Sequence, residues 1–305
     1  MRIAVIGGAG FIGSHSVRKL AAKGHAVTVI DDLSHGKREN IPAGVTLEVQ
    51  DIREPALVQL FERVRPEAVL HLAAQMDVRK SVADPTFDAA VNVLGTVNVL
   101  ESARRVGCKR IVFASSGGAV YGEQDVFPAT ESHARRPLSP YGVSKLCGEE
   151  YLSHYAIVHG MHTLALRYAN VYGPGQDPHG EAGVVAIFCE KMLRGDGPVI
   201  NGDGLQTRDY VHVDDVSDLN VLGVESTYTG ALNVGTGKET DVVVLAGHLA
   251  RALGWTKPLE HGPGKPGEQR RSVIDASLAR KTFGWAPRIE VAEGLAATAR
   301  WFASR

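Results

Sequence analysis

The 305-residue chain has little cysteine, almost no net charge and no long apolar run. Its three cysteines form no C-x-x-C pair, which argues against a disulfide framework and a cysteine-based zinc site. The 33 Lys and Arg residues face 34 Asp and Glu residues, without the basic surplus typical of nucleic-acid or membrane-surface binding. No apolar stretch reaches the roughly 18 residues that cross a bilayer, and none resembles a signal peptide. We therefore expect a cytoplasmic protein without nucleic-acid or membrane partners.

Histidine is more plentiful, but its twelve copies show no metal-ligand pattern with cysteine or carboxylates. His154, His159 and His162 surround the end of one predicted helix, and we expect no metal there or elsewhere. His71 ends an apolar run, which predicts a hydrogen-bonded core residue. Cys147 is expected to be a buried apolar filler.

Glycine is the residue in excess, with 34 copies, about 11% of the chain against an average near 7%. Such an excess indicates many positions that need a positive φ or a close backbone approach. The length is sufficient for one large domain or two closely joined ones.

The first 120 residues alternate short apolar runs with amphipathic stretches. Continuous apolar runs indicate strands buried on both faces, and strands separated by helices predict a parallel sheet with right-handed crossovers. The predicted strands cover residues 3–6, 26–30, 46–49, 68–72 and 110–114, and predicted helices between them include 12–23, 55–64 and 88–106.

A helix over residues 140–159 and a strand over 162–166 continue this pattern, which becomes irregular after Tyr172. We predict an α/β fold: a Rossmann-type doubly wound parallel sheet over residues 1–171 and a smaller C-terminal α/β domain over 172–305. Segments within 208–236, namely 209–213 and 231–234, are expected to return to the first sheet. The second domain has predicted loops at 173–183, 195–204 and 262–267 and predicted helices at 184–193, 242–253 and 277–283.

A glycine-rich loop, GGAGFIG over residues 7–13, separates the first strand from the first helix. Bare backbone lets a pyrophosphate approach the helix N-terminus, where free N–H groups favour anions. The second strand ends in Asp31 and Asp32, whose carboxylates can accept the ribose hydroxyls and repel a 2′-phosphate, so NAD is favoured over NADP. The loop residues expected to bind NAD are Gly7, Gly10, Phe11, Ile12 and Gly13.

Two later strand ends are expected to reach the same cofactor. Asp51 and Ile52 follow the third strand and are placed to reach the adenine, while Leu72, Ala73 and Ala74 follow the fourth and are placed to line the cofactor. For each of these positions, an ordinary helix cap or core role is the alternative interpretation.

Tyr141 and Lys145 lie four residues apart, on one face of the helix predicted over 140–159. A tyrosine is too weak an acid to serve as a base at neutral pH, but a nearby ammonium favours its phenolate. The pair therefore predicts proton removal from a sugar or alcohol hydroxyl, coupled to hydride transfer to NAD. Ser115 and Ser116 end the fifth strand and can place a hydroxyl beside the phenol.

Together these motifs resemble the extended short-chain dehydrogenase/reductase family, most closely its UDP-glucose 4-epimerase branch. The resemblance extends over essentially the whole chain. Segment 177–185, DPHGEAGVV, is similar to a bacterial subgroup of these epimerases. The segments that carry the resemblance are 7–14, 71–74, 115–122, 141–145, 167–174, 208–216 and 233–237.

The resemblance implies a mechanism. Tyr141, assisted by Ser116, takes the proton of the sugar 4-hydroxyl while the C4 hydride passes to a tightly held NAD. The resulting 4-keto sugar turns in the pocket and takes the hydride back on its other face. Lys145 holds the nicotinamide ribose and tunes Tyr141. The resemblance also implies a homodimer and cofactor contacts from Asn92, Ser115 and Tyr168.

For the UDP-sugar, the resemblance implies a second set of contacts. Asn170 and Arg208 bind the diphosphate, as suits a bidentate guanidinium. Ser272 stands where the family limits the size of the C2 substituent, so this small side chain predicts that UDP-GlcNAc and UDP-GalNAc are accepted alongside UDP-glucose and UDP-galactose. The remaining expected substrate contacts are Val184, Lys265 and Glu268.

Three positions depart from the family pattern. The strand end carries one extra residue, so counting from Phe113 selects Ser116 as the catalytic hydroxyl, whereas counting back from Gly122 selects Gly117. We choose Ser116 because glycine has no hydroxyl. Asn201 replaces an aromatic residue that commonly stacks on uracil, and Lys265 replaces an arginine.

The same residues bear on alternative functions. A nucleotide-sugar 4,6-dehydratase would need an acid–base pair where Gly117 and Gly118 stand. A UDP-glucuronate epimerase or decarboxylase stays open. A non-enzymatic NAD sensor would have no need of Tyr141 and Lys145.

Overall fold

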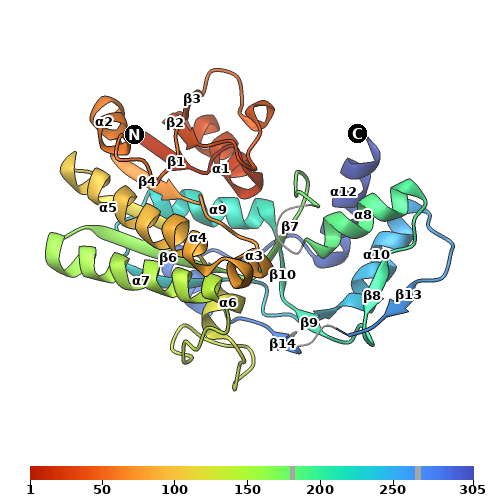
Figure 1. Ribbon diagram of the computed structural model, residues 1–305. Coiled ribbons are helices and arrows are strands. Elements are labelled where there is room, and N and C mark those ends of the chain that lie inside the picture. The colour runs from red at the N-terminus through yellow and green to blue at the C-terminus, as the bar shows by residue number, and fades with distance from the viewer. Residues whose placement is uncertain (179–182, 265–268) are drawn as a thin grey trace.

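The computed structural model describes residues 1–178, 183–264 and 269–305, and its centre is a seven-stranded parallel sheet (Figure 1). Its order, β11-β6-β5-β4-β1-β2-β3, extends the Rossmann arrangement by one strand. This confirms the predicted doubly wound α/β fold. The strands are β1 (Arg2–Ile6), β2 (Ala26–Asp31), β3 (Thr46–Val49), β4 (Ala68–His71), β5 (Arg110–Ser116), β6 (His162–Tyr168) and β11 (Gly230–Val234).

Helices cover both faces of this sheet, which is why its strands are continuously apolar. One face packs against α1 (Phe11–Ala22), α9 (Val213–Val224) and α11 (Ser277–Phe283). The other packs against α2 (Leu57–Val64), α5 (Gly95–Arg105) and α7 (Pro140–His159). The two faces carry separate apolar cores, so the sheet is a fully buried layer.

Helix α7 shows how local sequence sets its limits. The Ser139 side chain accepts a hydrogen bond from the Gly142 amide, and Pro140 takes the first helical position, where no amide hydrogen is needed. Gly160 ends the helix in the left-handed conformation. This predicted helix is confirmed at both ends.

The predicted helix over residues 88–106 is less regular than expected. The structure has α3 (Val78–Ala83), α4 (Pro85–Ala89), a π-helical turn η2 (Ala90–Leu94) and then α5. Asp84 caps α4 and Pro85 starts it. The wide turn places Asn92 inward, where it is buried against the loop after β4.

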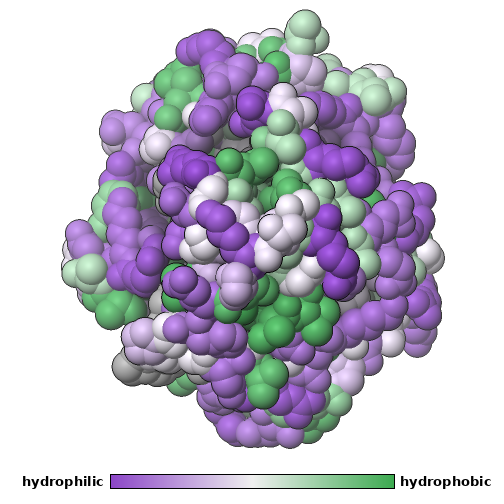
Figure 2. Space-filling view, turned by 90° about the vertical axis from the view of Figure 1, so that its right-hand side faces the viewer, coloured by the Kyte–Doolittle hydropathy of each residue, from purple (hydrophilic) through white to green (hydrophobic). Residues whose placement is uncertain are grey.

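A third apolar core lies in the C-terminal unit, among α8 (Val184–Arg194), α10 (Val242–Leu253) and α12 (Val291–Ala303) (Figure 1). Figure 2 shows the face of this unit, which is mostly hydrophilic with hydrophobic side chains in scattered groups. Short strands complete the unit: β7 (Asn170–Tyr172) pairs with β10 (Tyr210–His212), β8 (Val199–Asn201) with β13 (Glu260–Gly262), and β9 (Thr207–Arg208) with both β12 (Thr240–Asp241) and β14 (Arg271–Ser272).

Several sequence predictions need correction here. Residues 231–234 return to the central sheet in β11, but 209–213 do not, because β10 pairs with β7 in a separate two-stranded sheet. Residues 195–204 are not all loop, since they contain β8. Helices α9 and α12 and the short helices η1 (Arg38–Asn40) and α6 (Gly117–Tyr121) were not foreseen. Cys147 is half-buried rather than buried.

No helix within the described residues is both long enough and apolar enough to span a membrane. All three cysteines are free.

Candidate active site

A cleft of about 380 Å³ lies along the carboxyl edge of the central sheet, at the point between β1 and β4 where the strand order reverses. Open α/β sheets bind ligands at this position. Sixteen of the seventeen residues predicted to contact NAD line the cleft, and Asn92 does not. The sixteen are Gly7, Gly10, Phe11, Ile12, Gly13, Asp31, Asp32, Asp51, Ile52, Leu72, Ala73, Ala74, Ser115, Tyr141, Lys145 and Tyr168.

The glycine loop forms the floor of the cleft because side chains have no room there. A Cβ on Gly7 would lie 2.6 Å from the Ala73 amide nitrogen, and Gly7 has a φ of +79°. A Cβ on Gly13 would lie 2.1 Å from the Gly7 carbonyl oxygen. Gly10 caps α1 without a side-chain hydrogen bond, and the first turn of α1 has no acidic residue. Its amides therefore fit an anionic pyrophosphate.

The two acids after β2 have different environments. Asp31 is buried, and its carboxylate accepts hydrogen bonds from the Ala9 and Leu33 amides, both at 2.9 Å. Burial raises the pKa of Asp31. Asp32 is exposed and accepts from the Ser34 amide. Asp31 thus braces the glycine loop and keeps acceptor sites toward the cleft, since a carboxylate offers about four.

Asp51, predicted to reach the adenine, is engaged by a neighbouring cation. Arg53 donates to both of its carboxylate oxygens, with Nε to Oδ2 at 2.9 Å. This pairing lowers the pKa of Asp51. Arg53 also lines the cleft, and its guanidinium lies 5.3 Å from the centre of the Phe87 ring. The pair forms a charged wall at the end of β3.

Tyr141 and Lys145 are both buried, at 6% and 4% exposure, and both line the cleft. Lys145 Nζ lies 5.6 Å from the centre of the Tyr141 ring and 4.8 Å from that of Phe113. It donates to the Ala114 carbonyl oxygen at 2.8 Å. The structure therefore brings the phenol and the ammonium together in one cleft, as the sequence predicts.

Ser115 and Ser116 end β5, and the extra glycine of this segment starts helix α6. The Ser115 hydroxyl donates to Glu149 Oε1 at 2.6 Å. Ser116 is half-buried and pairs in register with Tyr168. Gly117 faces Ile274, so the inserted residue is accommodated by the turn into α6.

His71 is a core residue, as predicted. Its Nε2 lies 3.1 Å from Thr96 Oγ1. Burial lowers its pKa to about 3, and the charge of Lys145 acts in the same direction. The ring is therefore neutral at the end of β4.

Asn92 does not line the cleft but forms hydrogen bonds with Gln75, which does. Its side-chain oxygen accepts from the Gln75 amide, and its side-chain nitrogen donates to the Gln75 carbonyl, both at 2.8 Å. Asp88 accepts from Asn92, from the Gln75 side chain and from Ser144. Asn92 thus fixes the loop of residues 72–76 that lines the cleft.

None of the predicted substrate residues in the described part of the chain lines the cleft: Ser116 ends β5, and the others lie on α8 or on short strands. Asn170 is exposed on β7, and Val184 begins α8. Arg208 and Ser272 are register partners of β9 and β14, so two residues far apart in sequence become neighbours. Asn201, the departure from the uracil-stacking pattern, is on β8. Lys265 and Glu268 lie outside the described residues.

Sequence reasoning missed several residues of the cleft. Lys37, Asn40, Arg53, Lys80 and Gln176 line it without belonging to a motif of regular spacing. The Asn40 side chain and the Lys37 amide both donate to the Ala9 carbonyl oxygen, which ties the segment after β2 to the glycine loop. Two residues near the C-terminus, Phe302 and Arg305, also line the cleft, and no local signal could have placed them there.

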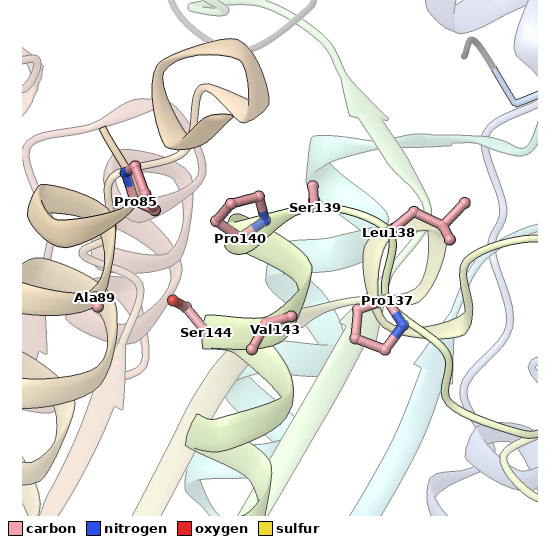
Figure 3. Close-up of a pocket in the computed structure, with 8 residues that line it drawn as sticks. All are labelled: Pro85, Ala89, Pro137, Leu138, Ser139, Pro140, Val143 and Ser144. Atoms are coloured by element: carbon pink, nitrogen blue, oxygen red, sulfur yellow. The ribbon is translucent and has the colours of Figure 1, made fainter. Parts of the chain in front are cut away.

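A second depression lies outside this cleft, between α4 and the start of α7 (Figure 3). Pro85 and Ala89 form one wall, and Pro140, Val143 and Ser144 lie on the other. Its lining has no titratable side chain. It therefore offers an apolar surface rather than a catalytic one.

Within residues 1–178, 183–264 and 269–305, no three His, Cys, Asp or Glu side chains gather as metal ligands. The groups that line the cleft along the carboxyl edge of the sheet suit a dinucleotide instead: free amides at a helix start, carboxylates after β2 and a Tyr–Lys pair.

A doubly wound sheet with a glycine loop and a buried Tyr–Lys pair in one cleft defines a nucleotide-dependent enzyme of the short-chain dehydrogenase/reductase type. The chain belongs to the NAD-dependent epimerase/dehydratase family, whose sequence model matches residues 3–235. The resemblance seen in the sequence is thereby confirmed, together with the expectation that the cofactor is NAD.

Full-length relatives support this assignment. The chain is 45% identical over 311 residues to the UDP-glucose 4-epimerase of Mycolicibacterium smegmatis, covering 100% of this chain and 99% of the relative. The crystal structure of a UDP-glucose 4-epimerase from Thermotoga maritima with UDP-glucose superposes with a TM-score of 0.97 at 45% identity, covering 100% and 99% of the two chains. The Thermus thermophilus UDP-glucose 4-epimerase in complex with NAD gives 0.94 at 44% identity, covering 99% of each chain.

Proposed function

We propose that the protein interconverts the two C4 epimers of a UDP-sugar, UDP-glucose and UDP-galactose, using tightly held NAD. The observation that carries the proposal is the burial of Tyr141 beside Lys145 in the cleft formed by the glycine loop. Relatives that are 44% and 45% identical over nearly their whole length bear the name UDP-glucose 4-epimerase.

In this proposal Tyr141 removes the proton of the 4-hydroxyl and later returns it. The Lys145 ammonium beside the ring favours the phenolate. Ser116 holds the same hydroxyl, and Arg208 and Asn170 bind the diphosphate. NAD, when bound, supplies the acceptor and the donor of a hydride at C4. Val184, Lys265 and Glu268 complete the proposed substrate contacts.

The pocket for the C2 substituent is proposed to be open. Ser272 has a small side chain and Gly118 has none. The two residues are neighbours, since a Cβ built on Gly118 would lie 3.4 Å from Ser272 Oγ, and the proposal is that they leave room for the C2 substituent. We infer that UDP-GlcNAc and UDP-GalNAc are also substrates.

The residues present disfavour two of the alternatives. Gly117 and Gly118 occupy the start of α6, where a 4,6-dehydratase would need a side-chain acid and base. An NAD sensor would not require a tyrosine and a lysine buried together. A UDP-glucuronate epimerase or decarboxylase is tested directly by the assay below.

The experiment is incubation of the purified protein with a panel of UDP- and dTDP-sugars, with products identified by NMR. Interconversion of UDP-glucose and UDP-galactose without added NAD is the expected result. Conversion of UDP-glucose but not of UDP-GlcNAc would refute the open C2 pocket. Conversion of none of these sugars, with NAD demonstrably bound, would refute the epimerase proposal.

Replacement of Tyr141 by Phe removes the proposed base while keeping the ring. General acid–base catalysis contributes about 10²- to 10⁴-fold, so turnover should fall by this factor while bound NAD stays. The NAD content, read from the absorbance of the released cofactor, is the internal control. Unchanged turnover would contradict the assigned role of Tyr141.

We also propose a homodimer formed through α7 and the helices beside it. The outer side of α7 exposes Val143, Tyr151 and Val158, and η2 next to it exposes Leu94. The apolar depression of Figure 3 lies on the same side. Burial of such a patch against a second copy removes apolar area from water.

Light scattering after gel filtration tests this surface. Tyr151→Glu should convert a dimer into a monomer, whereas Val244→Glu, on the exposed side of α10, should leave the mass unchanged. A wild-type protein that is monomeric at high micromolar concentration would refute the dimer.

Two further expectations belong to this proposal. The NAD-binding domain is proposed to comprise residues 1–171 with contributions from α9 and β11 within 208–236, and the UDP-sugar domain mainly 172–305. The location is cytoplasmic, which suits free thiols; burial raises the pKa of Cys108 to about 11 and makes it unreactive.

A further inference from the structure

Glu149 lies on the same buried side of α7 as Tyr141 and Lys145, one turn beyond Lys145. Two consecutive residues of β5 are tied to this side. Lys145 Nζ donates to the Ala114 carbonyl at 2.8 Å, and the Ser115 hydroxyl donates to Glu149 Oε1 at 2.6 Å. The helix therefore holds the end of β5 at two successive points.

Glu149 also binds the neighbouring strand. Arg167 donates from Nε to Oε1 at 2.9 Å and from Nη2 to Oε2 at 2.6 Å, and both side chains are only 4% exposed. Ser115 and Arg167 are register partners of β5 and β6. One carboxylate oxygen thus accepts from both members of a register pair. The half-exposed Arg135 approaches the other oxygen at 3.4 Å.

The polar contacts continue away from Arg167. Its Nη1 lies 2.9 Å from the Tyr121 hydroxyl, which donates to Asn233 Oδ1 at 2.7 Å on β11. The network therefore joins α7, β5, β6, α6 and β11 directly behind the carboxyl edge of the sheet.

A buried ion pair adds little net stability compared with apolar packing, because desolvation offsets the attraction. A bidentate carboxylate–guanidinium pair is, however, strongly directional. The feature that this arrangement provides is a fixed position for the end of β5. Ser116, the proposed catalytic hydroxyl, is the next residue along that strand.

We propose that Glu149 is a positioning residue: through Ser115 it fixes the end of β5 so that Ser116 and Tyr141 reach the same substrate hydroxyl. This inference rests on the proposed epimerase function. A misplacement of about 1 Å at a reacting group can lower turnover about 100-fold, so the loss of one tether should be visible in kcat.

The test compares two variants that each delete one buried hydroxyl tying a strand to α7. Ser115→Ala removes the tether to Glu149 and leaves the Arg167 pair in place. Thr163→Val removes the bond from Thr163 Oγ1 to the Leu152 carbonyl, at the opposite end of β6. The two hydroxyls are similarly buried.

Ser115→Ala should lower kcat about tenfold or more, with KM for UDP-glucose and the NAD content close to wild type. Thr163→Val should lose comparable thermal stability and keep its kcat. Equal kcat losses in the two variants would overturn the proposal. A loss of bound NAD in Ser115→Ala would also overturn it, because the cofactor contact predicted for Ser115, and not its tether to Glu149, would then account for the lower kcat.

A double-mutant cycle tests whether the effect of Ser115 on kcat depends on Glu149. If Ser115 acts through Glu149, Ser115→Ala should cost much less in a Glu149→Gln background than alone, and additive losses would contradict this. Should Glu149→Gln fail to fold, hydrogen–deuterium exchange still decides: residues 113–118 should exchange faster in Ser115→Ala and not in Thr163→Val. This readout needs no turnover, so an inactive wild type would refute the function alone.

Discussion

The wall of the cleft that carries the glycine loop is formed by the ends of β1, β2 and β4, each four to six residues long and paired in a seven-stranded sheet. The proposed substrate residues Asn170, Arg208 and Ser272 lie outside the lining of this cleft, on strands of two or three residues in small sheets. The cleft wall is mostly backbone. The substrate region depends on side chains that distant segments bring together, so substitutions in the two regions should fail in different ways.

The largest expected effect comes from a methyl group in the glycine loop. In Gly13→Ala, the new Cβ would lie 2.1 Å from the Gly7 carbonyl and 2.7 Å from the Gly8 Cα, and backbone at these places cannot yield. We expect loss of bound NAD and destabilisation of at least about 1–3 kcal/mol.

The same change in the other part of the molecule should have the opposite sign. A Cβ on Gly247, within α10, meets only the end of the Arg251 side chain at 3.9 Å. Gly247→Ala should therefore stabilise the protein by about 0.5–1 kcal/mol. Urea unfolding gives the free energy of unfolding of both variants. Equal destabilisation of the two would contradict the predicted difference in sign.

A smaller effect is expected among the proposed substrate residues. Arg208→Ala should raise KM for the UDP-sugar about 10- to 100-fold, because hydrogen bonds to charged groups contribute about 1.5–3 kcal/mol. NAD content should not change. Arg270→Ala, which breaks an exposed ion pair with Asp203 nearby, is the matched control and should leave KM near wild type. A fall in bound NAD with Arg208→Ala would mean that the cofactor cleft and the substrate region are not independent.

The last effect concerns pH: it is the smallest near neutral pH and grows as the pH falls. His71 has a pKa of about 3 because it is buried, whereas the unfolded chain takes up this proton near pH 6.5. The free energy of unfolding should therefore fall as the pH drops from about 6.5 toward 3, by up to about 1.4 kcal/mol per pH unit from this residue.

Urea titrations at several pH values measure this slope, and His71→Gln should flatten it. His212, on β10, is a useful comparison: burial lowers its pKa, but Asp214 and Asp215 act in the opposite direction. His212→Gln should change the slope less than His71→Gln. A larger change for His212 would place the main acid sensitivity in the small sheets.

The sequence was most informative where one contiguous segment builds the site. The glycine loop, Asp31 and the Tyr141–Lys145 pair each lie on a single strand–helix junction or one helix face, so spacing alone predicts their meeting. The same logic located the seven-stranded sheet with few errors at its strand ends.

Contacts between segments that are far apart in the sequence could not be predicted from spacing. Arg208 and Ser272 become neighbours through two-residue strands that carry no hydropathy signal. Residues 209–213 have the composition of a buried strand, and only the pairing with β7 shows that they stay outside the main sheet. The π turn at η2 interrupts an otherwise helical pattern, and it is this interruption that directs Asn92 to Gln75.

The late positions of helix α9 and strand β11 in the sequence affect how the chain folds during its synthesis. One apolar face of the central sheet packs against Val216 and Leu219 of α9, and β11 is the edge strand that covers the outer side of β6. During synthesis on the ribosome, the part of that face under α9 stays uncovered until residues 213–234 have emerged, although α1 and all other strands of the sheet are complete by Tyr168. We therefore expect a fragment that stops near residue 171 to aggregate rather than fold, and the NAD site to form only late in translation.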